Sequence, residues 1–511
     1  MKYTSTLLKA ALFATGLAGI VSEYTLSTLA TYFLGDSVFQ FTMIVSTMLF
    51  SMGLGSRLSK RIETNLIEKF VWIEFGLSVI ASNVTIIVYT FFAIYSDPTA
   101  IIYILSISVG LLIGMEIPLV IRLNEQFQSL RVNISSAMEN DYYGSLAGGV
   151  FFAFIGLPHL GLTYTPVILG AVNFSVAITV IIVIWKELPK NKRKRMLGYI
   201  SGVIIIICAS AFLSKAVVNW GDRVRYNDRV VYSEQSKYQK IVLTYSGDDY
   251  WFFLNGHQQL STADEALYHE PLVHPIMHLH EAPKSVLVLG GGDGVAVREL
   301  LKYPDLEKIV LVDLDPRVTK LAQNHPILLD INENALNHPM VEVINQDGFT
   351  YLESVKGQYD VIIADFPDPR TVDLGRLYSQ EFYWLCKQAL RLGGLMITQA
   401  GSPYYAQQAF ECIQLTMSKA GFTTLPLHNQ VPTLGEWGWV IGSKEATTNL
   451  GEQLRKQELR VSTQWLNQEA FTLISSFGKQ VFKKQYNKVK PNRIHDPVLY
   501  RYYLAGNWDL Y

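Results

Sequence analysis

Cysteine is scarce in this sequence, with only Cys208, Cys386 and Cys412 among 511 residues. These three lie far apart and none shows the C-x-x-C spacing of zinc or redox motifs, which argues against a cysteine zinc site and a disulfide framework. Cys208 falls in an apolar run, where a thiol acts as a small hydrophobic side chain.

The sequence also lacks an excess of either charge. Its 43 Lys and Arg nearly balance 44 Asp and Glu, for a formal net charge of −1, so the overall charge gives no indication of nucleic-acid binding. The length predicts several domains. The composition changes along the chain: it is mostly apolar up to about Trp220, then charged and punctuated by glycine.

The apolar half contains seven stretches that approach or exceed the roughly 20 residues needed to cross a bilayer. They lie at 8–33, 37–57, 70–95, 99–121, 145–163, 165–185 and 197–216. The first begins like a signal peptide, but it runs on too far and six more follow, so we expect no cleavage. The sequence predicts a multi-pass protein of the cell membrane, with the lipid bilayer as a partner.

Charged residues predict the orientation of these stretches. The loops 57–69 and 186–195 are basic, and Arg122 and Arg131 flank the exit of the fourth stretch. The positive-inside rule places these loops in the cytoplasm, and seven crossings then leave the C-terminal half outside.

Several acidic residues lie in or beside the predicted spans, and carboxylates at membrane depth are functional candidates. They are Glu23, Glu74, Glu116, Glu139 and Asp141. The alternative is that they pair with backbone, Ser or Tyr groups at interfacial depth. No transport path follows from the sequence.

Beyond about residue 228 the pattern predicts a different fold. Short strands with a turn at 247–249 indicate a small antiparallel sheet, and 264–280 looks helical until its prolines. Apolar strands then alternate with helical patterns, as in "SVLVLG", "KIVLVDLD", "VEVINQD", "YDVIIAD" and "GLMITQA". Such alternation is typical of a parallel α/β sheet, which binds ligands at the carboxyl ends of its strands.

The stretch "VLVLGGGDGVAVREL" (286–300) indicates the kind of ligand. A dinucleotide fingerprint requires glycine at position 295, which is Val here, and Asp293 within the turn would repel a pyrophosphate. Asp313, at the end of the next strand, can accept hydrogen bonds from a ribose. The pattern favours an adenosine without phosphates, such as an S-adenosyl sulfonium compound.

These residues resemble the polyamine aminopropyltransferases, the spermidine synthase family. The matching segments are "SKYQKIVL", "LNGHQQLSTADEALYHE", "GGGDG", "VDLD", "QDG" and "ADFPDP", while "GMEIPLVIRL" and "ENDYYGSLAGG" resemble the multi-pass domain of some bacterial members. The resemblance implies a membrane α-helical bundle, a small antiparallel β-domain and a Rossmann-like, class I methyltransferase-type parallel sheet. The expected domains are 1–216 (transmembrane), 217–263 (β-subdomain), 264–445 (catalytic) and 446–511 (helical extension).

The resemblance also implies a reaction: transfer of an aminopropyl group from decarboxylated S-adenosylmethionine to putrescine or a related amine. The products are spermidine and methylthioadenosine, and neither a cofactor nor a metal is expected. Asp365 would be the catalytic base, with Tyr268 and Asp368 holding the amine. The donor would be bound by Gln239, Gln259, Gly290, Gly292, Asp293 (amine end), Asp313 (ribose hydroxyls) and Asp347 (adenine amino group) beside Gly348. The acceptor pocket would include His269, Glu436 and Trp437.

Other interpretations of these residues stay open. Asp313 and Asp347 are also suited to capping helices or turns, Asp365 and Asp368 to turns before proline, and Tyr268 to core packing. His274 and His278 lie one helical turn apart, but Pro275 intervenes and the sequence names no facing acid, so we expect no metal there.

The sequence departs from the family on the acceptor side. Arg370 and Arg376 occupy a loop that should cover a polycation, His269 stands where soluble members commonly carry Gln, and 429–443 lacks the family's tyrosine. Two alternatives follow. One is an S-adenosylmethionine-dependent lyase or methyltransferase, for which Arg298 is the nearby basic residue for the substrate carboxylate. The other is a transporter or sensor that binds polyamine or nucleoside.

The expected donor conflicts with the loop charges. S-adenosyl donors are made in the cytoplasm, so the enzyme interpretation requires a cytoplasmic catalytic domain. The tail, 446–511, is helical in pattern to about residue 486, and its aromatic ending suits docking on the membrane interface or on a second subunit. The resemblance implies a homo-oligomer.

Overall fold

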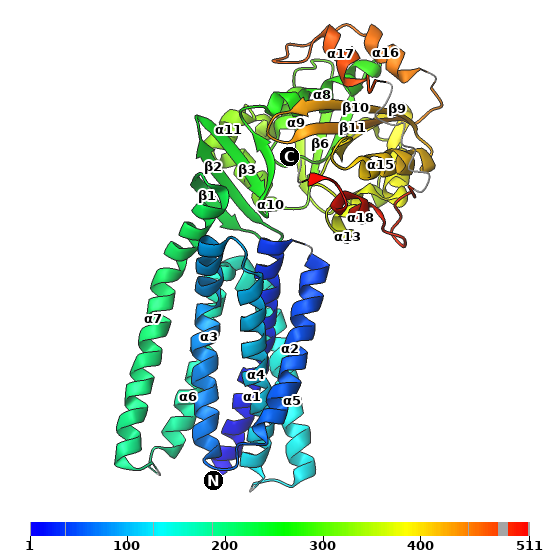
Figure 1. Ribbon diagram of the computed structural model, residues 1–511. Helices are drawn as coiled ribbons and strands as arrows, with labels where there is room; N and C mark the ends of the chain where they lie inside the picture. The colour runs from blue at the N-terminus through cyan, green and yellow to red at the C-terminus, as the bar shows by residue number, and fades with distance from the viewer. Residues whose placement is uncertain are drawn as a thin grey trace. The chain divides into compact units, whose positions relative to one another are not determined.

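The computed structural model of the chain describes residues 2–35, 37–125, 127–186, 188–447, 449–478 and 489–508. The chain forms two compact units, one of Met1–Ser246 with Phe253–His257 and one of Gly247–Phe252 with Gln258–Tyr511. The division falls within a small sheet. The first unit contains a bundle of long helices and the second contains the larger sheet (Figure 1).

The apolar stretches of the first unit form long helices, as predicted. Their bounds are α1 (Lys2–Leu34), α2 (Ser37–Ser59), α3 (Leu66–Tyr95), α4 (Thr99–Asn124), α5 (Leu130–Phe151), η1 (Phe152–Leu160), α6 (Gly161–Ile184) and α7 (Lys190–Tyr226). Six helical stretches of the described chain are long and apolar enough to cross a membrane. The sequence predicts seven spans. The numbers differ because the two expected spans 145–163 and 165–185 both fall in the single helical stretch Leu130–Ile184.

The N-terminal part of that stretch, α5, packs parallel to α1. A Cβ on Gly144 would lie 2.0 Å from the carbonyl oxygen of Phe13, and Gly148 lies one turn further along against Leu17. Glycine at both positions allows the two backbones to approach closely.

The C-terminal part, α6, packs antiparallel to α3. Ser78 Oγ donates to the carbonyl oxygen of Gly170 at 2.7 Å, and Thr85 Oγ1 donates to that of Leu162 at 2.6 Å. Both α1 and α3 run antiparallel to α4. Helices α5 and α6 therefore run in opposite directions, and the chain reverses around η1, which ends at Gly161 with a φ of 62°.

The small sheet has the strand order β1-β2-β3-β4, and β1 pairs antiparallel with β2. Its strands are β1 (Arg229–Gln235), β2 (Lys240–Ser246), β3 (Asp249–Leu254) and β4 (His257–Ser261). Gly247 and Asp248 have φ values of 61° and 79°, so the predicted turn is confirmed. Strand β1 was not among the strands that the sequence pattern predicts.

The larger sheet has seven strands in the order β10-β11-β9-β8-β5-β6-β7. They are β5 (Ser285–Gly290), β6 (Lys308–Asp313), β7 (Val341–Asn345), β8 (Tyr359–Asp365), β9 (Leu390–Gly401), β10 (Thr423–Val431) and β11 (Gly435–Ser443). Strands β5 to β9 are parallel, as predicted, while β11 pairs antiparallel with both β9 and β10. The antiparallel pair is an addition that the strand–helix alternation does not indicate.

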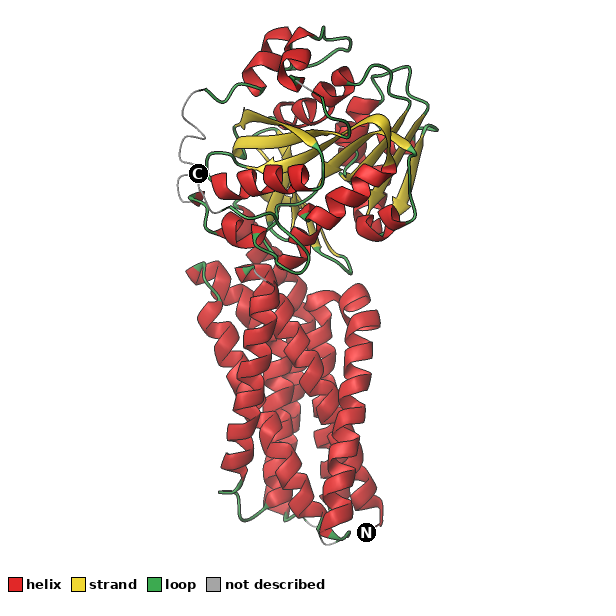
Figure 2. Ribbon diagram, turned by 90° about the vertical axis from the view of Figure 1, so that its right-hand side faces the viewer, coloured by secondary structure: helices red, strands yellow, loops and turns green. Residues whose placement is uncertain are grey.

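Helices pack against this sheet (Figure 2). They are α8 (Glu265–Leu279), α9 (Val295–Leu300), α10 (Pro316–Asn324), α11 (Pro326–Ile331), η2 (Ala335–Asn337), α12 (Gly348–Glu353), α13 (Val372–Gly375), η3 (Arg376–Tyr378), α14 (Gln380–Ala389) and α15 (Gln407–Lys419). One core cluster joins Leu287 and Ile362 of the central strands to Phe382 and Phe410 of the helices. The near-continuous apolar strands follow from burial on both faces.

Helix α8 continues through both of its prolines, whereas the sequence predicts that it ends there. Proline cannot donate to the carbonyl four residues earlier, so Pro271 leaves the carbonyl of Leu267 without its helical partner. Asn429 of β10 donates its side-chain amide to that oxygen at 2.8 Å. The two residues are 162 positions apart in the sequence, so a local sequence pattern cannot predict this hydrogen bond.

The C-terminal extension docks on its own unit. It contains α16 (Leu450–Lys456), α17 (Gln468–Ile474) and α18 (Leu499–Leu504), while 479–488 and 509–511 of the expected tail lie outside the described residues. Val498, Leu499 and Tyr503 are buried in the core cluster of the second unit. For these residues the expected docking on a membrane or a second subunit is wrong.

Candidate active site

The glycine turn after β5 lies against the ends of two strands. Gly290 pairs in register with Asp365, and the sheet order reverses between their strands, β5 and β8. A Cβ on Gly290 would lie 2.1 Å from the carbonyl oxygen of Asp365, and one on Gly292 would lie 2.6 Å from Asp313 Oδ2. The packing of two acidic strand ends thus requires glycine, in the crevice where such sheets bind ligands.

Asp365 is hydrogen-bonded to Tyr268 of α8. The tyrosine hydroxyl donates to Asp365 Oδ1 at 2.7 Å. Burial raises the pKa of Asp365 to about 6, opposed by the charge of His269 and the bond from Tyr268. Burial and the neighbouring acids hold the pKa of Tyr268 well above its usual value, so its phenol remains a donor. The structure brings together two of the three side chains that the resemblance assigns to catalysis.

His269 lies beside this pair and is buried. Its ring centroid is 5.0 Å from that of Tyr268, and its Nδ1 is 3.2 Å from Glu265 Oε2. Burial lowers the pKa of His269, but Glu265, Asp293 and Asp365 outweigh it and raise the pKa to about 9. At neutral pH the imidazole is therefore a fixed cation within electrostatic reach of Asp365.

Arg298 is fully used by the protein. It donates from Nη2 to both oxygens of Glu265 at 2.8 and 3.0 Å, from Nε to Glu299 at 3.0 Å, and from Nη1 to the carbonyl of Ile331 at 2.8 Å. The side chain is 7% exposed. A guanidinium bound in this way has no edge left for the carboxylate of a ligand.

Asp368 is held by two groups that the sequence analysis did not connect with it. Tyr503 Oη of α18 donates to Asp368 Oδ2 at 2.7 Å, and Arg370 Nη2 lies 3.1 Å from the same oxygen. The guanidinium of Arg370 also lies over the Tyr503 ring, 5.5 Å from its centroid. Asp368 Oδ1 is buried and has no hydrogen-bond partner within the described chain. That oxygen is available to an amine.

Two of the donor-side acids sit in the glycine turn and at the end of β6. Asp293 Oδ1 accepts from the backbone N–H of Val295 at 2.9 Å, and Asp313 Oδ1 accepts from that of Asp315 at 2.8 Å. Burial raises the pKa of Asp313 to about 7. Both acids are hydrogen-bonded to backbone N–H groups of nearby turns, and their roles in ligand binding remain predictions.

Asp347 has the capping role that the sequence leaves open. It accepts from the backbone N–H of Thr350 at 3.0 Å, one turn into α12, which begins at Gly348. Its other oxygen pairs with Arg376. The second unexpected arginine of the loop therefore neutralises Asp347, as Arg370 neutralises Asp368.

The two glutamines expected on the donor side lie in different compact units. Gln239 is in the first unit, where its backbone N–H donates to Ser236 Oγ at 2.9 Å. Gln259 is in β4 of the second unit and donates from Nε2 to the carbonyl of Gln258 at 3.1 Å. Their contact with the donor remains a prediction.

On the acceptor side, Glu436 pairs with His428 of the neighbouring strand β10. The other ring nitrogen of His428, Nε2, lies 2.9 Å from the carbonyl oxygen of Ser476. Trp437 is buried, and the Tyr268 ring packs instead on Trp439, with centroids 5.5 Å apart. Trp439, two residues beyond the expected position, therefore contacts the tyrosine that is bonded to Asp365.

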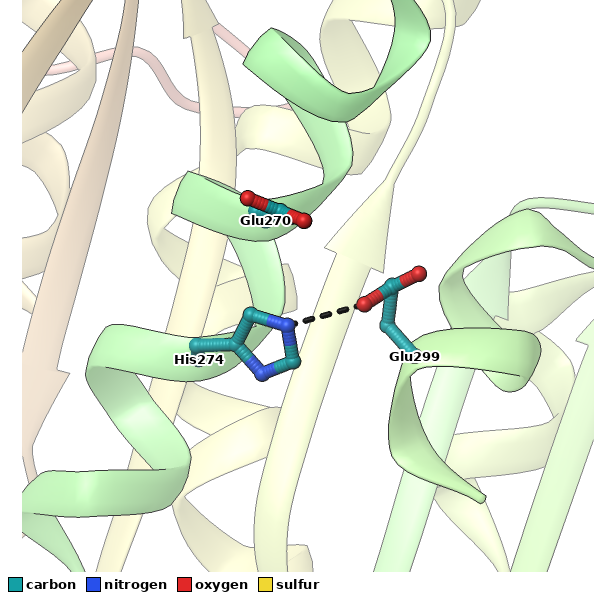
Figure 3. Close-up of side chains that lie close together, drawn as sticks. All are labelled: Glu270, His274 and Glu299. Atoms are coloured by element: carbon teal, nitrogen blue, oxygen red, sulfur yellow. Dashed lines mark hydrogen bonds and ion pairs between the residues drawn. The ribbon is translucent and has the colours of Figure 1, made fainter. Parts of the chain in front are cut away.

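A histidine and two acids gather near α8, contrary to the expectation that no acid faces His274 (Figure 3). His274 Nε2 lies 2.8 Å from Glu299 Oε2. Glu270 accepts three backbone N–H groups from 464–466 at 2.5–3.0 Å, and Glu299 also binds Arg298 and Lys302. Protein donors occupy the carboxylates, so the cluster has the character of a structural network that anchors the C-terminal extension.

Comparison with known proteins decides the family. Residues 265–453 match the spermine/spermidine synthase domain. The chain is 40% identical to polyamine aminopropyltransferase 2 of Aquifex aeolicus, with 98% of both chains covered. It belongs to the polyamine aminopropyltransferase family.

The chain is also similar to a second full-length relative and, over half its length, to a solved structure. The aminopropyltransferase is 38% identical to the polyamine aminopropyltransferase of Oceanobacillus iheyensis, over 97% of this chain and 96% of the relative. A crystal structure of spermidine synthase in complex with the transition-state analogue AdoDATO is 31% identical and has a TM-score of 0.46, covering 50% of this chain and 87% of that one. The similarity to full-length relatives includes the helical bundle.

Sequence reasoning missed the contact of Tyr503 with Asp368, one of the predicted site residues. Tyr503 lies 135 residues from Asp368, in a tail whose aromatic residues suggested a membrane or subunit contact. The only available signal was the missing family tyrosine in 429–443. Because 429–443 lacks this tyrosine, a tyrosine hydroxyl near the acceptor has to come from another segment, and Tyr503 is such a residue.

Proposed function

We propose that this aminopropyltransferase transfers the aminopropyl group of decarboxylated S-adenosylmethionine to putrescine or a related amine, with Asp365 as general base. The products are spermidine and methylthioadenosine. The observation that carries the proposal is the hydrogen bond of Tyr268 to buried Asp365 beside the glycine turn. Asp368, with one unpartnered oxygen, supplies a second anchor for the amine.

The chemical difficulty lies in the nucleophile. An alkyl ammonium with a pKa near 10 is about a thousandfold protonated at pH 7, so freeing its lone pair costs roughly 4 kcal/mol. In the reaction the amine nitrogen bonds to the aminopropyl carbon, and the carbon–sulfur bond breaks. Its electrons go to the sulfur, which leaves as a neutral thioether. The nitrogen's proton passes to Asp365.

The raised pKa of Asp365 suits this task. A carboxylate with a pKa of about 6 is a better base than one at its ordinary value, yet it remains ionised at neutral pH. Tyr268 fixes its orientation, and exclusion of water by the bound substrates favours the proton transfer.

The state of Arg298 supports a donor without a carboxylate. S-adenosylmethionine carries a carboxylate that needs a basic partner near the glycine turn, and Arg298 is already committed to Glu265, Glu299 and a backbone carbonyl. Decarboxylation removes that need. The same observation weighs against an S-adenosylmethionine-dependent lyase or methyltransferase.

The proposal includes insertion of the helical bundle in a bilayer, with α5 and α6 as separate crossings. Large apolar side chains are exposed on the bundle, among them Phe50, Leu146, Phe154, Ile205 and Phe212, the last at 85%. Exposed apolar surface of this extent suits lipid contact. Opposite directions of α5 and α6 support seven crossings in total.

Two arguments give opposite sides for the catalytic domain. Seven crossings with basic loops inside place it outside. We propose that the catalytic domain lies in the cytoplasm, because the donor is made there.

A topology reporter fused to the C-terminal end of the chain tests this side of the membrane. A reporter that is active only in the cytoplasm is expected to show activity. Activity of a reporter that works only after export would contradict the cytoplasmic placement.

A product assay tests the reaction. The purified full chain is incubated with decarboxylated S-adenosylmethionine, with and without putrescine, and methylthioadenosine and spermidine are measured by mass spectrometry. Spermidine is expected only with putrescine. Methylthioadenosine without an amine product, or turnover of S-adenosylmethionine alone, would contradict the proposal.

A further inference from the structure

The helical bundle buries two carboxylates that nothing in it neutralises. Glu74 of α3 and Glu116 of α4 are both 0% exposed. None of their four oxygens has a hydrogen-bond partner, and neither residue forms an ion pair, among the described residues. The two carboxyl groups lie near each other, and Asp141 of α5 lies near Glu116.

A buried amide oxygen lies at the same depth. Asn173 of α6 is 1% exposed and its Oδ1 also has no partner within the described chain. It shares a helix face with Gly170, which meets Ser78, and it adjoins Phe174, whose ring stacks on Phe75 with centroids 6.1 Å apart. Its side chain therefore faces α3 in the turn that carries Glu74.

These oxygens form an acceptor-rich region of the bundle, in which the Thr15 hydroxyl and the Asn173 amide are neutral donors and no cationic side chain pairs with the two glutamates among the described residues. Uncompensated carboxylates at such a depth are costly, and burial without pairing is the arrangement that proteins avoid. The nearby arginine of α4, Arg122, is committed to the carbonyl oxygens of Ser59 and Ile62 at 2.8 and 2.7 Å. A cation from outside the chain is the missing partner.

We propose that Glu74, Glu116 and Asn173 form a second amine-binding site, which holds the ammonium groups of a polyamine within the helical bundle. The choice of a polyamine rests on the proposed transfer reaction. Two carboxylates match two ammonium charges, and acceptors spread over three helices suit a cation with several N–H donors. The described bundle residues do not form a compact set of three metal ligands, which argues against a metal ion.

Equilibrium binding of radiolabelled spermidine to the detergent-purified full chain tests this site. Wild-type protein is expected to bind two molecules per chain, and E74Q/E116Q only one, with kcat and the amine KM unchanged. Glu139→Gln, on the exposed surface of α5, is the matched control and should still bind two. Retained transferase activity shows that the second unit of the double variant is folded.

A second variant covers the case in which the double one does not fold. Glu116→Gln alone should weaken the second binding event roughly tenfold or more. Binding of one spermidine by wild-type protein, or of two by E74Q/E116Q, overturns the proposal. The proposal is also overturned if radioactive sodium binds at the site in place of spermidine, or if the two carboxyl groups are simply protonated and bind no cation. Loss of transfer activity in wild-type protein would instead refute the proposed reaction, since binding and turnover are read separately.

Discussion

The two compact units of the chain bury carboxylates in different ways. In the second unit, Glu270 accepts three backbone N–H groups, and Glu299 binds an arginine, a lysine and a histidine. In the first unit, Glu74 and Glu116 are as deeply buried and have no partner among the described residues. Where the fold supplies donors, an acid anchors structure. Where the fold supplies no donors, a buried acid must bind a ligand or a proton, and it is a candidate for a functional role.

Asp365 and Asp368 fall between these extremes, because each is held by a tyrosine and still presents acceptor capacity to the crevice. The two acids proposed to act in catalysis are thus partly satisfied. The tyrosines orient both acids, and Asp368, although it is paired with Arg370 through Oδ2, keeps Oδ1 for an ammonium group.

The largest effect is expected at Asp365. Asp365→Asn keeps the hydrogen bond from Tyr268 but removes the base, so kcat should fall roughly 10²–10⁴-fold. Steady-state methylthioadenosine release measures it. Asp373→Asn, which changes an exposed acid in α13, is the control and should change little. If Asp365→Asn keeps more than a tenth of the activity, Asp365 is not the base.

The second-largest effect is expected at Arg298, which is hydrogen-bonded to the buried acids Glu265 and Glu299. Arg298→Met leaves Glu265 and Glu299 buried without their main partner, and should lower the stability of the second unit by about 3–5 kcal/mol. Thermal unfolding of the full chain measures this. Lys302→Met removes a partly exposed partner of Glu299 and should cost less than about 1 kcal/mol. Equal effects of the two variants would contradict the assigned role of Arg298.

Tyr503→Phe should impair the acceptor more than the donor. It removes the 2.7 Å bond to Asp368, and a bond to a charged group contributes about 1.5–3 kcal/mol. We expect kcat/KM for putrescine to fall roughly 10–100-fold while the donor KM stays constant. Tyr500→Phe, in the same helix but bonded to Arg501, serves as the control. An unchanged acceptor kcat/KM would remove Tyr503 from the site.

The smallest effect is expected in the bundle. Without polyamine, E74Q/E116Q removes two unpaired charges and should raise the Tm of the first unit by a few degrees. Glu139→Gln should leave it unchanged. A lower Tm for the double variant would mean that the carboxylates are already satisfied in the folded bundle.

The sequence predicts the parallel sheet because each apolar strand and each glycine turn is a local pattern. It also places Asp293, Asp313 and Asp365 correctly at strand ends or in the turn, since chain order fixes those positions. It does not predict the bonds of Asp368 with Tyr503 or of Leu267 with Asn429, because these partners lie 135 and 162 residues apart. Nor does it predict that Arg298 is occupied, because that depends on how α8 packs against α9.

The pH dependence of kcat/KM tests the central role of Asp365 most directly. The acid limb should lie near pH 6, with activity rising as Asp365 ionises. Because the bond from Tyr268 lowers the pKa of Asp365, Tyr268→Phe should move that limb to higher pH. A wild-type profile without a limb between pH 5 and 7, or a limb that Tyr268→Phe leaves in place, would contradict the assignment of Asp365 as the base.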